Sequence, residues 1–362
     1  MIPVSSIGTE ETEPRPDTHR PQHRAHVLDV ADTGPGATGA RGVLMPVLVV
    51  LMIGTVFVSV YLAAFHAPKP HRLPVAVVGS SQTLARVEAG LNAGSPGGFA
   101  VQGYADAADV RQALAHRTVY AGYIADGGSA RLLYAGANGS GVTATVTGAF
   151  DAVAKAGGQQ VSAQDVLPAS SGDTRGLSVF YAGFGVVLAA FLFGSLTYQA
   201  APRLEYRWRM FSLALFGVLG GCMVALVGGQ VFHAIPGPFV GVAGLSALMA
   251  IAAGGATMAL MRLCGAAGSS LASVLLLILG NATSGGILPS AYLPALLAPL
   301  HEILPVGVGV QSIQGLAYFR HDGLVLGVTV LTTWIVVCAV VLYLKDVWSV
   351  RVRRPDDGAD AA

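Results

Sequence analysis

Five stretches of this chain contain no charged side chain, and each is long enough to cross a lipid bilayer. The longest runs for 52 residues, from Met210 to Met261. A membrane helix needs about 20 mostly apolar residues to cross the hydrocarbon core. The sequence therefore predicts a polytopic α-helical membrane protein.

We predict six transmembrane helices, because Pro236 and Pro238 interrupt the longest stretch and divide it into two spans. The first apolar run has 24 residues and follows a long hydrophilic tail, which indicates an uncleaved anchor and not a signal peptide. The predicted spans are residues 42–65, 177–198, 210–232, 239–260, 269–288 and 323–344.

The distribution of Lys and Arg predicts the orientation, because these residues collect on the cytoplasmic side. With the amino terminus inside, the two short outer connections contain only Arg320. The inner segments contain Arg24, Arg41, Arg203, Arg207, Arg209, Arg262, Lys345, Arg351, Arg353 and Arg354. We therefore expect both tails, 1–41 and 345–362, in the cytoplasm. Heavy use of Ala, Gly, Val and Arg is typical of a GC-rich bacterial gene, so the predicted location is a bacterial plasma membrane.

Composition agrees with a membrane protein and gives no sign of nucleic-acid binding. Charged residues make up 11% of the chain, against about 25% in soluble domains, and the net charge is +1. The tail 1–41 contains too few large apolar residues to fold, so we expect disorder. His19, His23 and His26 lie in that tail without a folded context, and we assign no metal to them.

Residues 66–175 separate the first two spans and are expected to form a small extracytoplasmic α/β domain. Strands are predicted at 73–79, 99–105, 120–126 and 130–136, and helices follow the first two and the last. The order βαβαββα favours a mixed sheet with helices packed against it. This domain contains no cysteine, so disulfides cannot stabilise it.

Known catalytic motifs are absent from the sequence. There is no Gly-x-Ser-x-Gly elbow, no His-Glu-x-x-His pair and no phosphate-binding Gly-x-x-x-x-Gly-Lys-Ser/Thr loop. We expect no enzyme activity, no cofactor and no ATP hydrolysis by this chain itself. Asp106, Asp109, Asp126 and His116 are better explained as helix caps or solvated residues.

Small residues recur every four positions along the third predicted span. They are Gly217, Gly221, Ala225 and Gly229. Such a stripe lets a neighbouring helix approach closely in the membrane. We favour packing within the chain, with Ser246, Ala250 and Gly254 as partners, and a dimer contact is the alternative.

The fifth predicted span ends in a segment that should break the helix. The residues that we predict to line a transport path are Asn281, Thr283, Ser284, Gly285, Gly286 and Pro289. Broken helices at membrane depth expose backbone groups that must face protein or a polar cavity, and they often mark transport paths. Four prolines then prevent a continuous span over 289–322, which suggests re-entrant or interfacial helices with His301 and Glu302 near water. A passive outer cap is an equally good explanation.

The order of these features resembles the export-type (type-2) permeases of ABC transporters, in particular their phage-infection-protein-like branch. The residues that carry the resemblance are LPVAVVG (73–79), YAGYIAD (120–126), DVLPASSGDTRGLSVFYAGFG (165–185), NATSGGILPSAYLP (281–294) and the LPVGVGVQSIQG that follows. The outer insertion of this chain is more compact than in the longer branch members.

This resemblance implies one membrane half of an exporter, which works as a homodimer or with a similar permease and is driven by a separate cytoplasmic ABC ATPase. In such permeases the surface between the second and third spans meets the ATPase. In this chain that surface contains Arg203, Glu205, Arg207 and Arg209. Their simpler explanation is anchoring by positive charge on the inner side.

Three functions therefore compete. The first is export of a hydrophobic or amphipathic compound. The second is a non-transporting receptor or scaffold of an envelope or secretion complex that uses its outer α/β domain. The third, a proton-driven transporter, is disfavoured because the spans contain no Asp, Glu, Lys or Arg, and His233 lies at a helix end.

Overall fold

The computed structural model describes residues 40–126 and 129–352. Most of this part of the chain is helical, and it contains one small mixed β-sheet. Among the described residues, those from Val50 onward form one compact unit, and 40–49 belong to a separate one. The predicted tail histidines lie outside the described residues.

Five helices of the described part are long and apolar enough to cross a membrane. They are α1 (Ala40–Phe65), α5 (Ser178–Ala200), α6 (Tyr206–Val224) with its continuation η2 (Ala225–Val231), α7 (Phe239–Cys264) and α12 (Leu324–Val352). The prediction of apolar helices in these stretches is confirmed. The interruption at the two prolines is also confirmed, because helical structure ends at Val231 and resumes after Pro238.

The fifth apolar stretch forms a shorter helix than we predicted. It consists of α8 (Ala266–Ala272), the π-helix η3 (Ser273–Leu279) and α9 (Gly280–Ala282). Helical structure therefore stops six residues before the predicted end at Leu288. The break comes directly after Ala282, shortly before Gly285 and Gly286.

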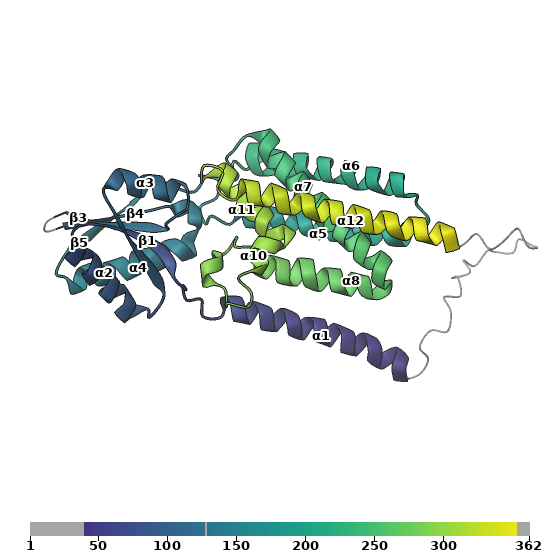
Figure 1. Cartoon of the computed structure of the whole chain (residues 1–362), viewed down its shortest axis with the longest axis horizontal. Helices are drawn as coiled ribbons and strands as arrows, with labels where there is room; N and C mark the ends of the chain where they lie inside the picture. The colour runs from purple at the N-terminus through teal and green to yellow at the C-terminus, as the bar shows by residue number, and fades with distance from the viewer. Residues whose placement is uncertain (1–39, 127–128, 353–362) are drawn as a thin grey trace, which may run out of the picture. The chain divides into compact units, whose positions relative to one another are not determined.

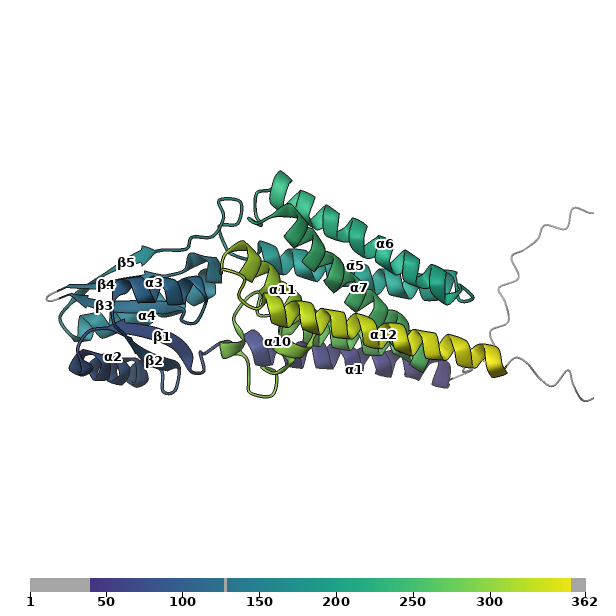
Figure 2. The same cartoon turned by 45° about the horizontal axis from the view of Figure 1, so that its top comes forward.

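Helix α7 is the centre of the helical region. Helices α5, α6 and α12 each pack against it, and Figure 2 shows these helices running side by side. Small side chains allow the close packing, because a Cβ on Gly194 would lie 3.0 Å from the carbonyl oxygen of Gly254. The carboxylate of Asp173 stabilises the N-terminal end of α5, because it accepts hydrogen bonds from the backbone N–H groups of Leu177 (3.0 Å) and Ser178 (2.8 Å).

The sheet has five strands in the order β2-β1-β3-β4-β5. They are β1 (Leu73–Val78), β2 (Phe99–Tyr104), β3 (Ala121–Asp126), β4 (Ser129–Tyr134) and β5 (Gln160–Asp165). β3 and β4 are antiparallel and the other neighbours are parallel, which confirms the predicted mixed sheet. The four predicted strands are all present, but β5 was missed because its sequence QVSAQD is polar and largely exposed.

Helices cover both faces of this sheet. Helices α2 (Ser81–Gly94) and α4 (Ser140–Ala156) lie on one face, and α3 (Ala107–Ala115) lies on the other (Figure 1). The alternation of β1 explains this arrangement, because Val75 and Val77 join the core under α2 and α4 while Ala76 joins the core under α3. Asp106 caps α3 by accepting from the N–H groups of Ala108 and Asp109.

The segment that joins α9 to α12 contains short helices. They are η4 (Ser290–Tyr292), α10 (Leu300–Ile303) and α11 (Pro305–Ala317), and η1 (Gly136–Asn138) is a similar short turn in the sheet domain. Prolines precede or begin each of the three, as expected from their missing N–H. Most residues of α11 are buried, and the helix packs against α5, α7 and α12.

Candidate functional site

The helix break places buried polar residues among apolar helices. Asn281, Thr283 and Ser284 are all buried. The Asn281 amide donates to the hydroxyl of Tyr61 on α1 at 2.6 Å, and Thr283 donates to the carbonyl of Leu279 at 2.8 Å. The side-chain oxygen Oδ1 of Asn281 has no hydrogen-bond partner within the described residues. A buried acceptor without a partner is costly in free energy.

The two glycines of the break are required by close contacts. Gly285 has a φ of 71°, and a Cβ there would lie 2.6 Å from Cε1 of His301. A Cβ on Gly286 would lie 2.7 Å from the Cβ of Phe180 on α5. The sequence therefore uses glycine where the chain turns back against a histidine and an aromatic ring.

His301 connects the break to α11. Its Nδ1 lies 3.1 Å from the backbone carbonyl oxygen of Thr283, and its Nε2 lies 3.1 Å from Oε1 of Gln311. Our prediction that His301 lies near water is wrong, because the side chain is 8% exposed. The adjacent Glu302 is exposed, as predicted.

Burial determines the charge of this histidine. Burial lowers the pKa of His301 below the usual value, the hydrogen bond that the ring donates to the carbonyl oxygen of Thr283 opposes that shift, and the nearby Arg117 reinforces it. Only a doubly protonated imidazole can donate to both oxygen atoms. The neutral ring donates to one of them, so protonation would add a hydrogen bond between α11 and the break.

Arg117 joins the sheet domain to the same network. It follows α3 with a φ of 54°, and its side chain is 10% exposed. Nε donates to Oδ2 of Asp322 at 2.9 Å and Nη1 donates to Oε1 of Gln314 at 2.9 Å. The guanidinium lies 4.4 Å from the ring centroid of Phe319, within the range of a cation–π contact.

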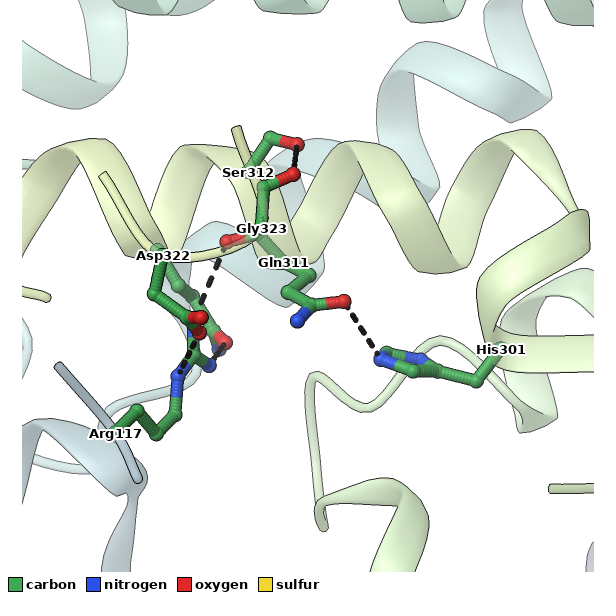
Figure 3. Close-up of polar contacts among 7 residues, drawn as sticks. Arg117, His301, Gln311, Ser312, Asp322 and Gly323 are labelled. Atoms are coloured by element: carbon green, nitrogen blue, oxygen red, sulfur yellow. Dashed lines mark hydrogen bonds and ion pairs between the residues drawn. The ribbon is translucent and has the colours of Figure 1, made fainter. Parts of the chain in front are cut away.

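These contacts form one continuous network, which Figure 3 shows. Nη2 of Arg117 donates to the backbone carbonyl of Gln311 at 3.4 Å, and the Gln311 side chain reaches His301. Hydrogen bonds therefore connect Arg117 to Thr283 through Gln311 and His301.

A polar cavity of about 160 Å³ lies within the network. Gly285 and Pro289 of the predicted break line it. The other lining residues are Arg117, Tyr120, Asn138, Ser290, His301, Glu302, Gln311, Gln314 and Asp322. The sequence did not indicate Arg117, Gln311 or Asp322, although the polar pair Gln311 and Gln314, three residues apart in an apolar helix, was an available signal.

The predicted ATPase-contact residues are not equivalent in the structure. Arg203 is exposed, and Arg207 and Glu205 form an exposed ion pair of 2.8 Å. Arg209 is buried and donates to Asp346 of α12 at 2.8 Å. Arg262 of α7 binds the same carboxylate. Arg209 therefore holds helices together, and only the other three are available to a partner.

The predicted stripe of small residues lies partly against α7. A Cβ on Gly217 would meet Ile251, and one on Gly221 would lie 2.2 Å from the carbonyl oxygen of Ala243. Ala225 is buried, and Gly229 lies near Ile235. The neighbours of Gly217 and Gly221 are Ala243, Ala247 and Ile251, one residue away from the register that we expected on α7.

No group of three or more His, Cys, Asp or Glu residues among those described is arranged to hold a metal ion. No family model, curated protein or solved structure matches this chain. Its function has to be inferred from the residues and their geometry.

Proposed function

We propose that this protein is the membrane-spanning subunit of an ABC-type exporter that moves a hydrophobic or amphipathic compound outward, powered by a separate ATPase. The observation that carries this proposal is the helix break after Ala282, where buried polar residues end an apolar helix and the following Gly285 lines a polar cavity. Irregular backbone at such a place is tolerated where it lines a protein cavity or a path.

In this proposal six segments cross the membrane, and residues 266–282 with the break form the fifth crossing. The sheet domain then lies outside the cell and both termini lie in the cytoplasm, as the Lys and Arg distribution predicts. Arg203, Glu205 and Arg207 face the ATPase, and two copies of the permease form the working unit. The sequence has no phosphate-binding loop, so the ATPase is a separate chain.

Purification from the native membrane in a mild detergent tests this proposal. We expect ATP hydrolysis to accompany the tagged protein and to be lost when Arg203 and Arg207 are both changed to Glu. Arg131→Glu, an exposed change on β4, is the matched control and should retain the hydrolysis. Hydrolysis that is absent from the wild-type preparation would overturn the proposal.

A receptor or scaffold is the second candidate, and the Arg117 network favours it because that network connects the sheet domain to the helical region. Removing residues 69–174 distinguishes the two. An exporter should keep its ATPase partner without the domain, because the partner binds at the opposite side of the membrane. A receptor or scaffold that works through the sheet domain should lose its envelope or secretion partner when that domain is removed.

A further inference from the structure

An apolar cleft separates α5 from α6. Both helices pack on α7, and they contact each other much less. The cleft has a volume of about 570 Å³, which is within the range of about 300–1,000 Å³ of small-molecule sites. Buried Val186, Val224, Ile235 and Ala250 form its floor.

The lining of the cleft is polar at one end only. Ser178 and Tyr181, in the first turn of α5, provide hydroxyl groups, and the remaining lining side chains are apolar. None of them is charged. Tyr181 and Met223 at the rim are exposed, so the cleft is open at its side. This pattern complements a hydrocarbon chain with a polar group at one end.

The length of the cleft matches one leaflet of a membrane. It extends along α5 from Ser178 to Ala189 and along α6 and η2 from Phe216 to Val227. At about 1.5 Å per residue, each wall is about 16 Å long. Half of a hydrocarbon core of about 30 Å has nearly the same thickness.

A π-helix widens one wall of the cleft. η2 contains Val227 and Gly228, and the Gly228 carbonyl accepts hydrogen bonds from the N–H groups of Ala234 (2.8 Å) and Ile235 (3.0 Å). The chain thus folds back beneath the cleft and Ile235 closes its floor. π-helical turns are rare and occur frequently at functional sites.

We propose that this cleft binds the alkyl chain of a membrane amphiphile, with its polar group near Ser178 and Tyr181. If the protein is the proposed exporter, on which this role in transport rests, the amphiphile enters the cleft sideways from the surrounding lipid. The binding itself needs neither ATP nor a second protein.

Glycines allow the cleft to be filled without disturbing the fold. A Cβ added to Gly185 of α5 or to Gly220 of α6 meets nothing within 4 Å, and both residues line the cleft. Gly185→Leu and Gly220→Leu therefore fill it from opposite walls. Gly244→Leu is the matched control, because Gly244 of α7 is also unobstructed but is not part of the lining.

The test is photolabelling of the full chain in phosphatidylglycerol nanodiscs with a lysophospholipid that carries a diazirine in its palmitoyl chain. Trypsin releases α5 in the peptide 176–203 and most of α12 in the peptide 321–345, which reports contact with bulk lipid. We expect strong labelling of 176–203. Each filling variant should reduce it about tenfold or more, because every buried CH₂ contributes about 0.8 kcal/mol.

Three results would overturn this inference: equal labelling of both peptides, labelling unchanged by both filling variants, or weak labelling of 176–203 in the wild type, as expected if a second copy filled the cleft. Labelling also separates the two proposals. A preparation without ATP hydrolysis that is labelled as expected refutes the exporter and retains the site. Uniform labelling in a preparation that hydrolyses ATP refutes the site alone.

Discussion

Two aspartates, one just before helix α12 and one within its last turns, each bind arginine from elsewhere in the chain. Asp322 precedes the helix and binds Arg117 of the sheet domain, whereas Asp346 in its last turns binds Arg209 and Arg262 from α6 and α7. Arg117 has further partners in Gln314 and Phe319, but Nε of Arg262 is buried without a partner within the described residues. The contact at Asp322 connects the sheet domain to the helical region, whereas the contact at Asp346 holds α6, α7 and α12 together within the helical region.

The comparison predicts the largest effect at Asp346. Asp346→Asn leaves two arginines that are 6% and 27% exposed without their carboxylate. Removing one partner of a buried ion pair costs about 3–5 kcal/mol. Unfolding in detergent should show this loss, and Asp151→Asn, which breaks an exposed pair with Lys155, should change stability by less than about 0.5 kcal/mol. Equal effects would show that the Asp346 contact does not hold the helices.

Arg117 should have a smaller effect on global stability and a larger one on communication between the domains. Arg117→Leu removes hydrogen bonds to Asp322 and Gln314, but Asp322 is 30% exposed and water can replace its partner. We expect a loss of about 2–3 kcal/mol. Hydrogen exchange should rise in α11 more than in α6. A uniform rise would contradict a local role, and Arg117→Lys should recover only part of the loss because it lacks the forked donor geometry.

Gly285 tests how the break is held against His301. Gly285→Ala combines the cost of a left-handed backbone with a clash at Cε1 of His301, for an expected loss of about 1–3 kcal/mol. Gly265→Ala is the control, since its φ is 61° and its Cβ would meet nothing within 4 Å. Thermal unfolding should show a larger loss at Gly285. In a His301→Ala background, where the clash is absent, Gly285→Ala should cost no more stability than Gly265→Ala. A larger cost in that background would mean that the clash is not the cause.

The sequence predicted the apolar helices and most of the sheet because both depend on local patterns. A stretch of 52 uncharged residues and the short apolar run of β1 are visible without a structure. The polar network was not predictable in the same way. Arg117 and Asp322 are 205 positions apart, and nothing in the sequence near either residue identifies the other. The break was predicted from its glycines, but the burial of His301 depends on how α10 and α11 fold over it.

His301 provides the smallest effect and the most specific test of the network. Burial lowers its pKa in the folded protein, whereas an unfolded histidine titrates near about 6.5. Between the two pKa values the unfolded chain binds more protons, so the free energy of unfolding should fall as the pH decreases below about 6.5. His301→Gln should remove this pH dependence while the acid response of the Asp and Glu residues remains. Because Arg117 also disfavours the charged imidazole, Arg117→Leu should raise the pKa and weaken the same dependence. A pH profile identical in wild type and His301→Gln would mean that this histidine does not titrate with folding, and the link from the sheet domain to the helix break would then carry no proton-sensitive step.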